Sequence, residues 1–177
     1  MSIRYFKEDL AFSAQTNRSI IILKHALVSH TIHLTFLFRA GQSLSNIPYL
    51  GVVARIIIEY LIRVIYSSDI SCRAKIGPGL SIVHGHDIVI GADVVIGRNT
   101  KIFNGVTFGN KDISQTSFGN QPTVGDGCIF CTGAKVLGPV KIGNNVIVGA
   151  NSVLLQDCDD HDIVAGVPAK FIKKLKL

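Results

Sequence analysis

Residues 90–102 read IGADVVIGRNTKI, and in this stretch an apolar residue returns at every sixth position, usually with glycine directly after it. The same period continues on both sides. Its apolar anchors are Ile76, Ile82, Ile90, Ile96, Ile102, Phe108, Val124, Phe130, Val136, Ile142, Val148 and Leu154. A period of six fits neither a helix of 3.6 residues per turn nor a strand that alternates at two. It predicts a stacked solenoid in which three short strands per coil share a narrow core and glycine turns the corners.

The period breaks at two places. Ile82 and Ile90 are eight residues apart, so this coil carries two extra residues and bulges outward at 84–87, which read HGHD. Phe108 and Val124 are sixteen residues apart, which leaves room for a polar excursion of about ten residues between Asn110 and Gln121. Insertions in a repeat array usually form loops on one face, often the binding face, although an idle surface loop is the plain alternative.

Residues 1–67 lack this period, so the sequence predicts two parts: an N-terminal helical region at 1–67 and a solenoid with a C-terminal tail at 68–177. The apolar segment 20–38 approaches the length of a membrane span, but a lysine and three histidines within it make spanning unfavourable. Packing in a helical cap is the first interpretation of this region. Docking on the inner face of the membrane is the second.

Two apolar segments carry the helices of the first part. They are 19–38 and 52–66, and they predict two or three helices with 41–48 as the turn. In the second segment Arg55, Glu59 and Arg63 recur every four residues, which places these charges along one side of a helix and leaves apolar groups to pack.

Composition narrows the class of protein. The chain has 177 residues, is 47% hydrophobic and carries a net charge of +6, which is typical of a packed domain with an anionic partner or a solvated basic tail. No Arg- and aromatic-rich stripe and no nucleic-acid motif accompanies this charge, so no nucleic-acid partner is expected. Charged residues stand where the apolar part of a signal peptide should begin, so a cytoplasmic location is expected.

The four cysteines do not resemble a disulfide framework. Cys128 and Cys131 form one C-x-x-C, but Cys128 occupies a small inward position of the repeat, which favours burial over metal binding. With no second ligand pair nearby, no metal site is expected.

The bulge contains the best candidate for chemistry. A histidine such as His84 is suited to removing a proton from a hydroxyl near neutral pH, and it works better when a carboxylate orients it. Asp69 stands fifteen residues earlier, which we interpret as roughly two coils back in the stack. His86 and Asp87 compete for the same roles, and the residues alone leave the choice open.

Four motifs carry a resemblance to a known family. They are DISCRAKIGPG at 69–79, IVH at 82–84, GVTFGN at 105–110 and AGVPAK at 165–170. Together they resemble the serine acetyltransferase branch of hexapeptide-repeat acyltransferases. In size and pattern the chain is most similar to the members of that branch that O-acetylate surface polysaccharides, such as the colanic acid acetyltransferases. The resemblance covers about residues 68–172, and the bulge followed by G-V-T-x-G is its most specific part.

The resemblance implies a mainly β fold, a left-handed parallel β-helix behind the small helical region, and a homotrimer with acetyl-CoA as donor. It places each active site between neighbouring subunits, with His84 as general base, Asp69 as its partner, and direct attack of the acceptor hydroxyl on the thioester. A backbone N–H near Gly109 is the implied oxyanion donor. The implied contacts with the donor are Thr107, Gly109, Asn110, Gly133, Ala134, Ala150 and Lys170. Repeat geometry alone explains the glycines and alanines equally well.

The chain departs from serine acetyltransferases where the acceptor binds. Those enzymes carry an Asp before the catalytic His and an Arg-His pair before the Pro that ends the excursion, whereas this chain has Val83, Asn120 and Gln121. An amino acid needs a cation for its carboxylate and an acid for its ammonium group, so we expect L-serine to be a poor acceptor. The expected acceptor-binding residues are Val83, His86, Asn104, Asn120 and Gln121.

The sequence therefore predicts an acetyl-CoA-dependent O-acetyltransferase that modifies a sugar hydroxyl of a capsular, exopolysaccharide or lipopolysaccharide precursor. Serine O-acetylation in cysteine synthesis is the alternative within the same fold. A non-catalytic hexapeptide scaffold is the alternative from another class. A carbonic anhydrase-like metal trimer is disfavoured, because the spacing of the three solenoid histidines, His84, His86 and His161, does not suggest a shared metal.

Overall fold

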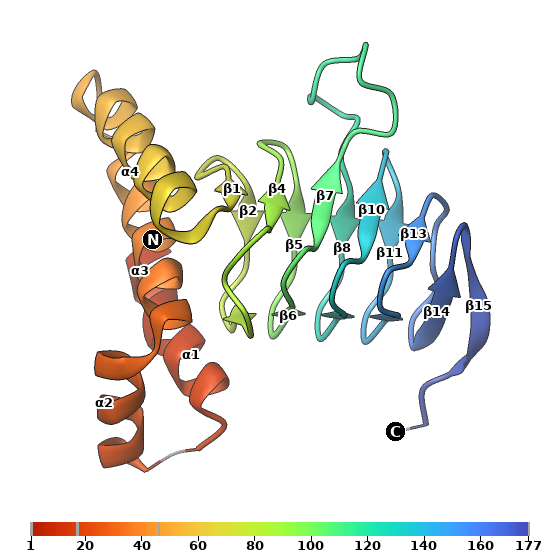
Figure 1. The fold of residues 1–177 in the computed structure, drawn as a ribbon, viewed down its shortest axis with the longest axis horizontal. Helices are drawn as coiled ribbons and strands as arrows, with labels where there is room; N and C mark the ends of the chain where they lie inside the picture. The colour runs from red at the N-terminus through yellow and green to blue at the C-terminus, as the bar shows by residue number, and fades with distance from the viewer. Residues whose placement is uncertain (1, 17, 46, 177) are drawn as a thin grey trace.

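The computed structural model describes residues 2–16, 18–45 and 47–176, and it shows four helices followed by a solenoid of short strands (Figure 1). The helices are α1 (Ser2–Ala14), α2 (Ser19–Val28), α3 (His30–Leu44) and α4 (Leu50–Tyr66). The strands are β1 (Asp69–Ile70), β2 (Lys75–Ile76), β3 (Ser81–Ile82), β4 (Val89–Ile90), β5 (Val95–Ile96), β6 (Lys101–Ile102), β7 (Thr107–Gly109), β8 (Thr123–Val124), β9 (Ile129–Phe130), β10 (Lys135–Leu137), β11 (Lys141–Ile142), β12 (Ile147–Val148), β13 (Val153–Leu154), β14 (Asp162–Gly166) and β15 (Ala169–Lys174).

The strands form three sheets, one on each side of the solenoid. Sheet A has the order β1-β4-β7-β10-β13, sheet B has β11-β8-β5-β2, and sheet C has β15-β14-β12-β9-β6-β3. Up to β13 every third strand returns to the same sheet, and all pairings are parallel except that of β14 with β15. The described part of the chain is thus the predicted parallel β-helix with an N-terminal helical region.

The pairing register reproduces both breaks in the six-residue period. A regular coil is eighteen residues long, as in the pairing of Val89 with Thr107. Asp69 pairs with Val89, twenty residues later, because the bulge adds two residues to that coil. Thr107 pairs with Lys135, twenty-eight residues later, because the excursion adds ten.

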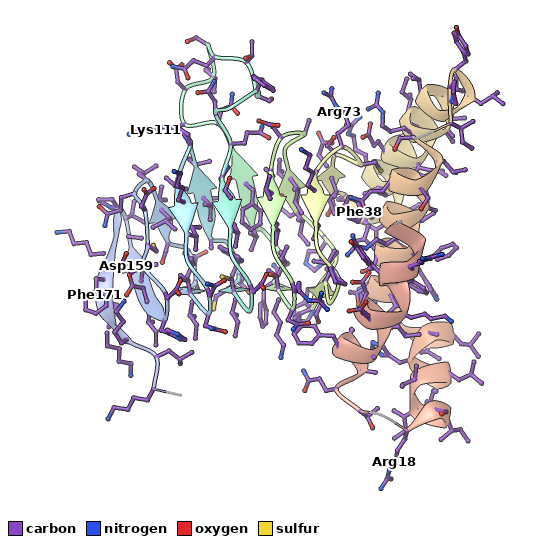
Figure 2. All side chains as sticks on the ribbon, turned by 180° about the vertical axis from the view of Figure 1, so that it is seen from behind. Arg18, Phe38, Arg73, Lys111, Asp159 and Phe171 are labelled. Atoms are coloured by element: carbon purple, nitrogen blue, oxygen red, sulfur yellow. The ribbon has the colours of Figure 1, made fainter. Side chains whose placement is uncertain are left out.

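The apolar anchors form the core of the solenoid, as the period predicts. The anchor residues from Ile76 to Leu154 are at most 4% exposed, and Phe108 and Phe130 stack edge to face with ring centroids 4.7 Å apart. A solenoid this narrow buries its anchors only because each coil covers the next, so its two ends need caps. At the C-terminal end the hairpin β14–β15 covers the last coil, and Figure 2 shows Asp159 and Phe171 at this end.

The helices cap the other end. Helices α1 and α3 pack against β3, and Figure 2 shows Phe38 of α3 where this helix meets the solenoid. At this junction Arg39 of α3 is completely buried and donates to both carboxylate oxygens of Asp9, at 2.8 and 3.1 Å. It also donates to the carbonyl oxygens of Ile76 at 2.7 Å and Gly77 at 2.6 Å, so one guanidinium joins two helices to the first coil.

The helical region differs in detail from the prediction. It has four helices rather than two or three, because α1 precedes the apolar segments and the first of these segments bends by 82° at Ser29. The predicted turn at 41–48 is wrong for its first residues, since α3 continues to Leu44 with Gly41 buried inside it. A Cβ atom at Gly41 would overlap Cys72 Sγ, so this glycine lets the helix approach the solenoid closely rather than ending the helix.

The outer side of the cap is apolar. On α4 the exposed apolar residues recur every four positions and form two adjacent columns. One column is Val52, Ile56, Tyr60 and Val64, and the other is Val53, Ile57, Leu61 and Ile65. Each of these residues is 37–61% exposed in the single chain. In the part of the chain that the structure describes, no single helix has the length and apolarity to cross a membrane. Helices α2 and α3 satisfy that criterion of length and composition only as a bent pair.

Candidate functional site

Apart from Lys170, which lies on β15 of sheet C, the predicted site residues lie on the strands of sheet A or at its two opposite edges. The turns that enter sheet A from sheet C, at 83–88, 103–106, 131–134 and 149–152, form what we call the histidine corner. The turns that leave it toward sheet B, at 71–74, 91–94, 110–122 and 138–140, form the loop corner. Only the strands of sheet A separate the two, so within one chain they do not make a common pocket.

His84, His86 and Asp87 are the exposed residues of the bulge, and His84 is the first of them. Its ring centroid lies 6.3 Å from that of Phe103 in the next coil and 6.5 Å from that of His86. Two hydrogen bonds join the bulge to the segment between α4 and β1. Asp87 N–H donates to the carbonyl oxygen of Ser67, and Ser68 Oγ donates to that of Gly85. A fixed turn that leaves an imidazole exposed is suited to a general base that meets its substrate from outside.

Asp69 lies nearer to the bulge than the sequence suggests. The interpretation that it stands two coils back is wrong, because it pairs with Val89 and so belongs to the coil directly adjacent. Its carboxylate contacts Arg63 of α4 at 2.8 Å, and among the described residues no hydrogen bond joins it to His84. Ser68, the residue before Asp69, contacts Gly85, the residue after His84, which brings the two candidates to the same turn.

Small residues line the histidine corner above the bulge. Gly105 N–H donates to the carbonyl oxygen of His86, and Gly133 N–H donates to that of Asn104, so successive coils stack in register. The side chain of Asn104 accepts from Thr132 Oγ1 at 3.2 Å. Along this corner Gly105 is buried, Gly133 is half-buried and Ala150 is exposed. Ala134 does not belong to this surface, because its side chain is fully buried in the core.

Lys135 lies beside the predicted site residues Gly105 and Thr107, and the sequence analysis did not name it. Its ammonium group donates to the carbonyl oxygen of Gly105 at 2.6 Å and to Thr107 Oγ1 at 3.1 Å, so it lies on sheet A at the rim of the histidine corner. The six-residue period carries a signal for it, since Lys135 precedes an anchor and must point outward. The period does not say that its amine reaches back to the coil below.

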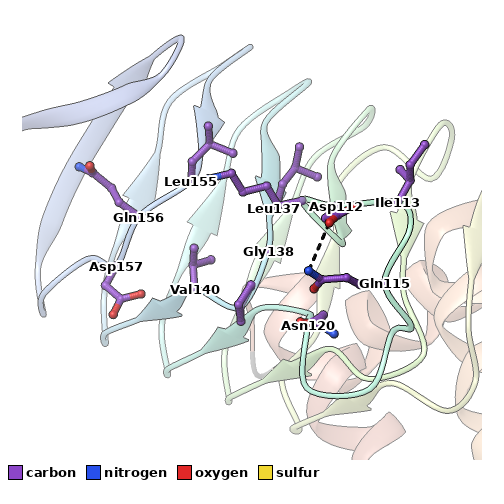
Figure 3. A pocket seen from close by; sticks show the side chains of 12 residues that line it. Asp112, Ile113, Gln115, Asn120, Leu137, Gly138, Val140, Leu155, Gln156 and Asp157 are labelled. Carbon is purple, nitrogen blue, oxygen red and sulfur yellow. Dashed lines mark hydrogen bonds between the residues drawn. The ribbon is translucent and has the colours of Figure 1, made fainter.

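The loop corner holds a groove between the excursion and the coils that follow it. The groove has a volume of about 670 Å³. Figure 3 shows Ile113, Gln115 and Asn120 of the excursion on one side and Leu137 and Leu155 of the coils on the other. Its lining mixes aliphatic side chains with amides and carboxylates, which suits an amphipathic, extended ligand.

Most polar side chains of the excursion are used inside it. Asn120 and Asn110 both donate to the carbonyl oxygen of Thr116, and Gln121 Oε1 accepts from Asp93 N–H at 2.8 Å. The predicted sugar pocket is therefore not assembled in one chain. Asn120 and Gln121 shape the loop corner, whereas Asn104 and His86 lie at the histidine corner.

The remaining predicted residues separate in the same way. Gly109 lies at the loop corner, where a Cβ atom would meet only Thr107 Cγ2 at 3.9 Å, so its backbone is open to approach. Val83 extends β3 by donating to the carbonyl oxygen of Ile102 and is half-buried. Lys170 is exposed on β15.

The cysteines are free, and three of the four are buried. Burial raises the pKa of the Cys128 thiol to about 11 and that of Cys72 to about 12. Cys128 lies inward, as predicted, and donates to the carbonyl oxygen of Gly143 at 3.2 Å. Across 2–16, 18–45 and 47–176, no cluster of three His, Cys, Asp or Glu side chains has metal-binding geometry.

Comparison with known proteins identifies the repeats. Residues 121–156 match the family model described as bacterial transferase hexapeptide, with six repeats. A serine acetyltransferase from Staphylococcus aureus is 39% identical over 122 residues, which are 69% of this chain and 56% of that protein. One from Staphylococcus epidermidis is 37% identical over 150 residues, which are 85% of this chain and 65% of that protein. The chain thus spans less than two thirds of either relative.

Solved structures of serine acetyltransferases share the fold over almost the whole chain. One in complex with CoA superposes with a TM-score of 0.83 and 28% identity, covering 97% of this chain and 69% of that one. One from Neisseria gonorrhoeae superposes with a TM-score of 0.86 and 27% identity, covering 99% and 68%. These neighbours and the hexapeptide repeats support the left-handed sense of the β-helix.

The comparisons support part of the predicted function and overturn another part. They agree with the hexapeptide-repeat acyltransferase class and with acetyl-CoA as donor. The prediction of a surface-polysaccharide acceptor is wrong, and so is the reading of this chain as most similar to polysaccharide acetyltransferases. Its sequence relatives and structural neighbours are serine acetyltransferases. The polar residues of the excursion misled the prediction, because Asn120 bonds within the loop and Gln121 bonds to Asp93 in the neighbouring turn.

Proposed function

We propose that this chain is an acetyl-CoA-dependent O-acetyltransferase that transfers an acetyl group to the hydroxyl of L-serine. The observation that carries the proposal is an exposed histidine, held in a two-residue bulge beside Asp69, on a β-helix shared with serine acetyltransferases over 97% of the chain. The reaction is inferred from the similarity to serine acetyltransferases. The general base is inferred from the bulge, which exposes His84.

In this proposal His84 is the general base. Its imidazole removes the proton from the acceptor hydroxyl while the oxygen attacks the thioester carbonyl carbon, and the C–S bond then breaks to release the CoA thiolate, which takes up a proton. Asp69 acts through His84 by orienting the ring and stabilising the imidazolium that forms. In the structure without substrate this carboxylate is bound to Arg63 instead, so we propose that it turns toward His84 when the acceptor enters.

We further propose that the chain works as a homotrimer. The histidine corner and the loop corner lie on opposite edges of sheet A in one chain, so a single copy offers the base and the groove separately. A three-fold arrangement would set the histidine corner of one copy against the loop corner of the next. The complete site would then form between subunits, as the family resemblance implies.

The donor would occupy both corners. The groove beside the excursion is amphipathic, and the space where a Cβ atom of Gly109 would stand is open, which suits a pantetheine arm that approaches the backbone closely. Gly133 and Ala150 of the facing copy would let the arm lie close to the coils. Lys170 is exposed and would meet a phosphate. We also propose a cytoplasmic location, because the donor is made there. The apolar face of α4 would pack against another subunit of the oligomer.

The test is a thiol-release assay with acetyl-CoA and millimolar L-serine, with mass spectrometry of the product. We expect CoA release that depends on serine and a product that carries one acetyl group on oxygen. His84→Ala, verified as a folded trimer, is the matched inactive control. Absence of serine-dependent release from the wild-type trimer would reject the proposal, and failure to bind acetyl-CoA at all would favour a non-catalytic scaffold.

A further inference from the structure

A serine acceptor leaves one charge without an assigned partner. L-Serine brings a carboxylate to the active site, and a buried or half-buried carboxylate needs a cation, best a guanidinium that binds it through two N–H groups. The excursion of this chain has Asn120 and Gln121 where the resemblance expects the cation, and both amides are used within the loop corner. Lys111 of the excursion lines the groove at the loop corner, which within one chain lies at the opposite edge of sheet A from the bulge. A cation beside the candidate base must therefore come from another element.

The end of α4 supplies one. Arg63 lies in the last turn of this helix, and Figure 1 shows α4 leading directly into β1, which begins with Asp69. Its Nη2 contacts Asp69 Oδ1 at 2.8 Å. Tyr66, one helical turn later, lies against the bulge, because a Cβ atom at Gly85 would stand 3.7 Å from Tyr66 Cδ1. The end of α4 therefore contacts the candidate carboxylate through Arg63 and the bulge that carries the candidate base through Tyr66.

The guanidinium is held but not saturated. The side chain of Arg63 is 57% exposed, and Asp69 takes one of its five N–H donors. Such an exposed pair adds little to stability, so the fold does not depend on it. Its position next to the negative end of the α4 dipole and beside a carboxylate keeps the group charged and oriented. Oriented, exposed and charged donors beside a general base are what a small anionic group on an acceptor would use.

Other cations are less suited to this role. Lys135 is half-buried and donates to two oxygen atoms of its own chain. Arg55 is paired with Glu59 at 3.1 Å and lies two turns further from β1. Arg39 is fully buried in the cap. Among the described residues, Arg63 is the exposed guanidinium that touches the predicted catalytic partner.

We propose that Arg63 binds the carboxylate of the amino-acid acceptor and so sets the preference of the enzyme for serine over uncharged alcohols, an inference that rests on the proposed function. The acceptor carboxylate docks on the free N–H groups of Arg63. This contact draws the guanidinium partly away from Asp69, and the freed carboxylate turns to His84. Binding of the correct acceptor thereby completes the catalytic pair.

The experiment compares two acceptors with three proteins. L-Serine and L-serinamide carry the same hydroxyl and amine, but serinamide has a neutral amide in place of the carboxylate. Both are assayed with wild type, Arg63→Gln and Arg98→Gln. Arg98 is the matched control, because it is also 57% exposed and paired with a carboxylate, that of Glu8 at 3.0 Å, yet it follows β5, away from both corners.

We expect wild type to prefer serine over serinamide by about 10- to 100-fold in kcat/KM, the range of one charge-assisted pair of hydrogen bonds. Arg63→Gln should lose this preference, mainly through a higher KM for serine, with serinamide changed by less than about threefold. Arg63→Lys should restore part of it, since it keeps the charge without the fork. Arg98→Gln should behave as wild type.

Two results would overturn the inference while leaving the proposed function in place. If Arg63→Gln lowers both acceptors equally, Arg63 acts through Asp69 and recognises no carboxylate. If it changes neither, Arg63 has no part in the site. A wild-type protein that acetylates neither acceptor would instead reject the proposed function, and this inference with it. Size-exclusion chromatography and circular dichroism establish that each variant keeps the assembly and helical content of wild type.

Discussion

Replacement of Arg39 by Met should detach the helical cap from the solenoid. The guanidinium donates twice to Asp9, once to Gln42, and once each to the carbonyl oxygens of Ile76 and Gly77. Without it the carboxylate of Asp9, which is 0% exposed, still accepts from the backbone N–H of Leu80 at 2.8 Å but has lost its cation. A buried charge that loses its partner costs about 3–5 kcal/mol, which is a large part of the stability of a domain of this size.

The double variant Asp9→Leu with Arg39→Met tests the cause. It removes both charges together, so it should be more stable than Arg39→Met alone by about 1–3 kcal/mol. It should not regain the full stability of wild type, because the carbonyl oxygens of Ile76 and Gly77 still lose their donors. Arg98→Met, which breaks an exposed pair, should cost no more than about 1 kcal/mol.

The assay is urea unfolding followed by circular dichroism, at one protein concentration for all variants because assembly affects apparent stability. The rate at which a thiol reagent modifies Cys72 gives a second measurement, since this thiol is 3% exposed beneath α3. Its modification should be faster in Arg39→Met than in wild type. A loss below about 1 kcal/mol in Arg39→Met, with Cys72 still protected, would refute the reasoning that this buried pair joins cap and solenoid.

Three further outcomes are expected. In steady-state kinetics with serine, His84→Ala should lower the rate of acetyl transfer by about 10²–10⁴-fold with the fold retained, and Asp69→Asn should lower it less. A larger loss in Asp87→Asn than in Asp69→Asn would assign the partner role to Asp87. Gly41→Ala should destabilise the protein because the new methyl group overlaps Cys72 Sγ, and Cys72→Ala in the same chain should restore much of the loss; equal urea midpoints for wild type and Gly41→Ala would contradict the packing. Burial raises the pKa of the Cys128 thiol to about 11 from an ordinary 9.0, so its contribution to stability is complete below pH 9 and is lost as the pH rises toward 11. The fall in urea midpoint between pH 8 and pH 10 should therefore be smaller in Cys128→Ala than in wild type, and equal falls would contradict this pKa shift.

The sequence alone was sufficient for the solenoid. The six-residue period encodes which side chains point inward, and a narrow coil has only one way to bury them, so the anchors, the bulge at 84–87 and the excursion all lie where the pattern predicts. The same local logic singled out the bulge with His84, His86 and Asp87, because an insertion in a strict period marks where residues leave the core, and the catalytic role of His84 stays a prediction.

Contacts between distant segments needed the tertiary structure. The sequence shows Gly41 as a turn residue and Asn120 and Gln121 as open polar groups, since their partners in space are far away along the chain. The pairing of Arg63 with Asp69 depends on where α4 ends relative to the first coil, which the helix period does not encode. Periodicity reports the local direction of each side chain, whereas partners across elements depend on how those elements pack, and packing is a property of the whole chain.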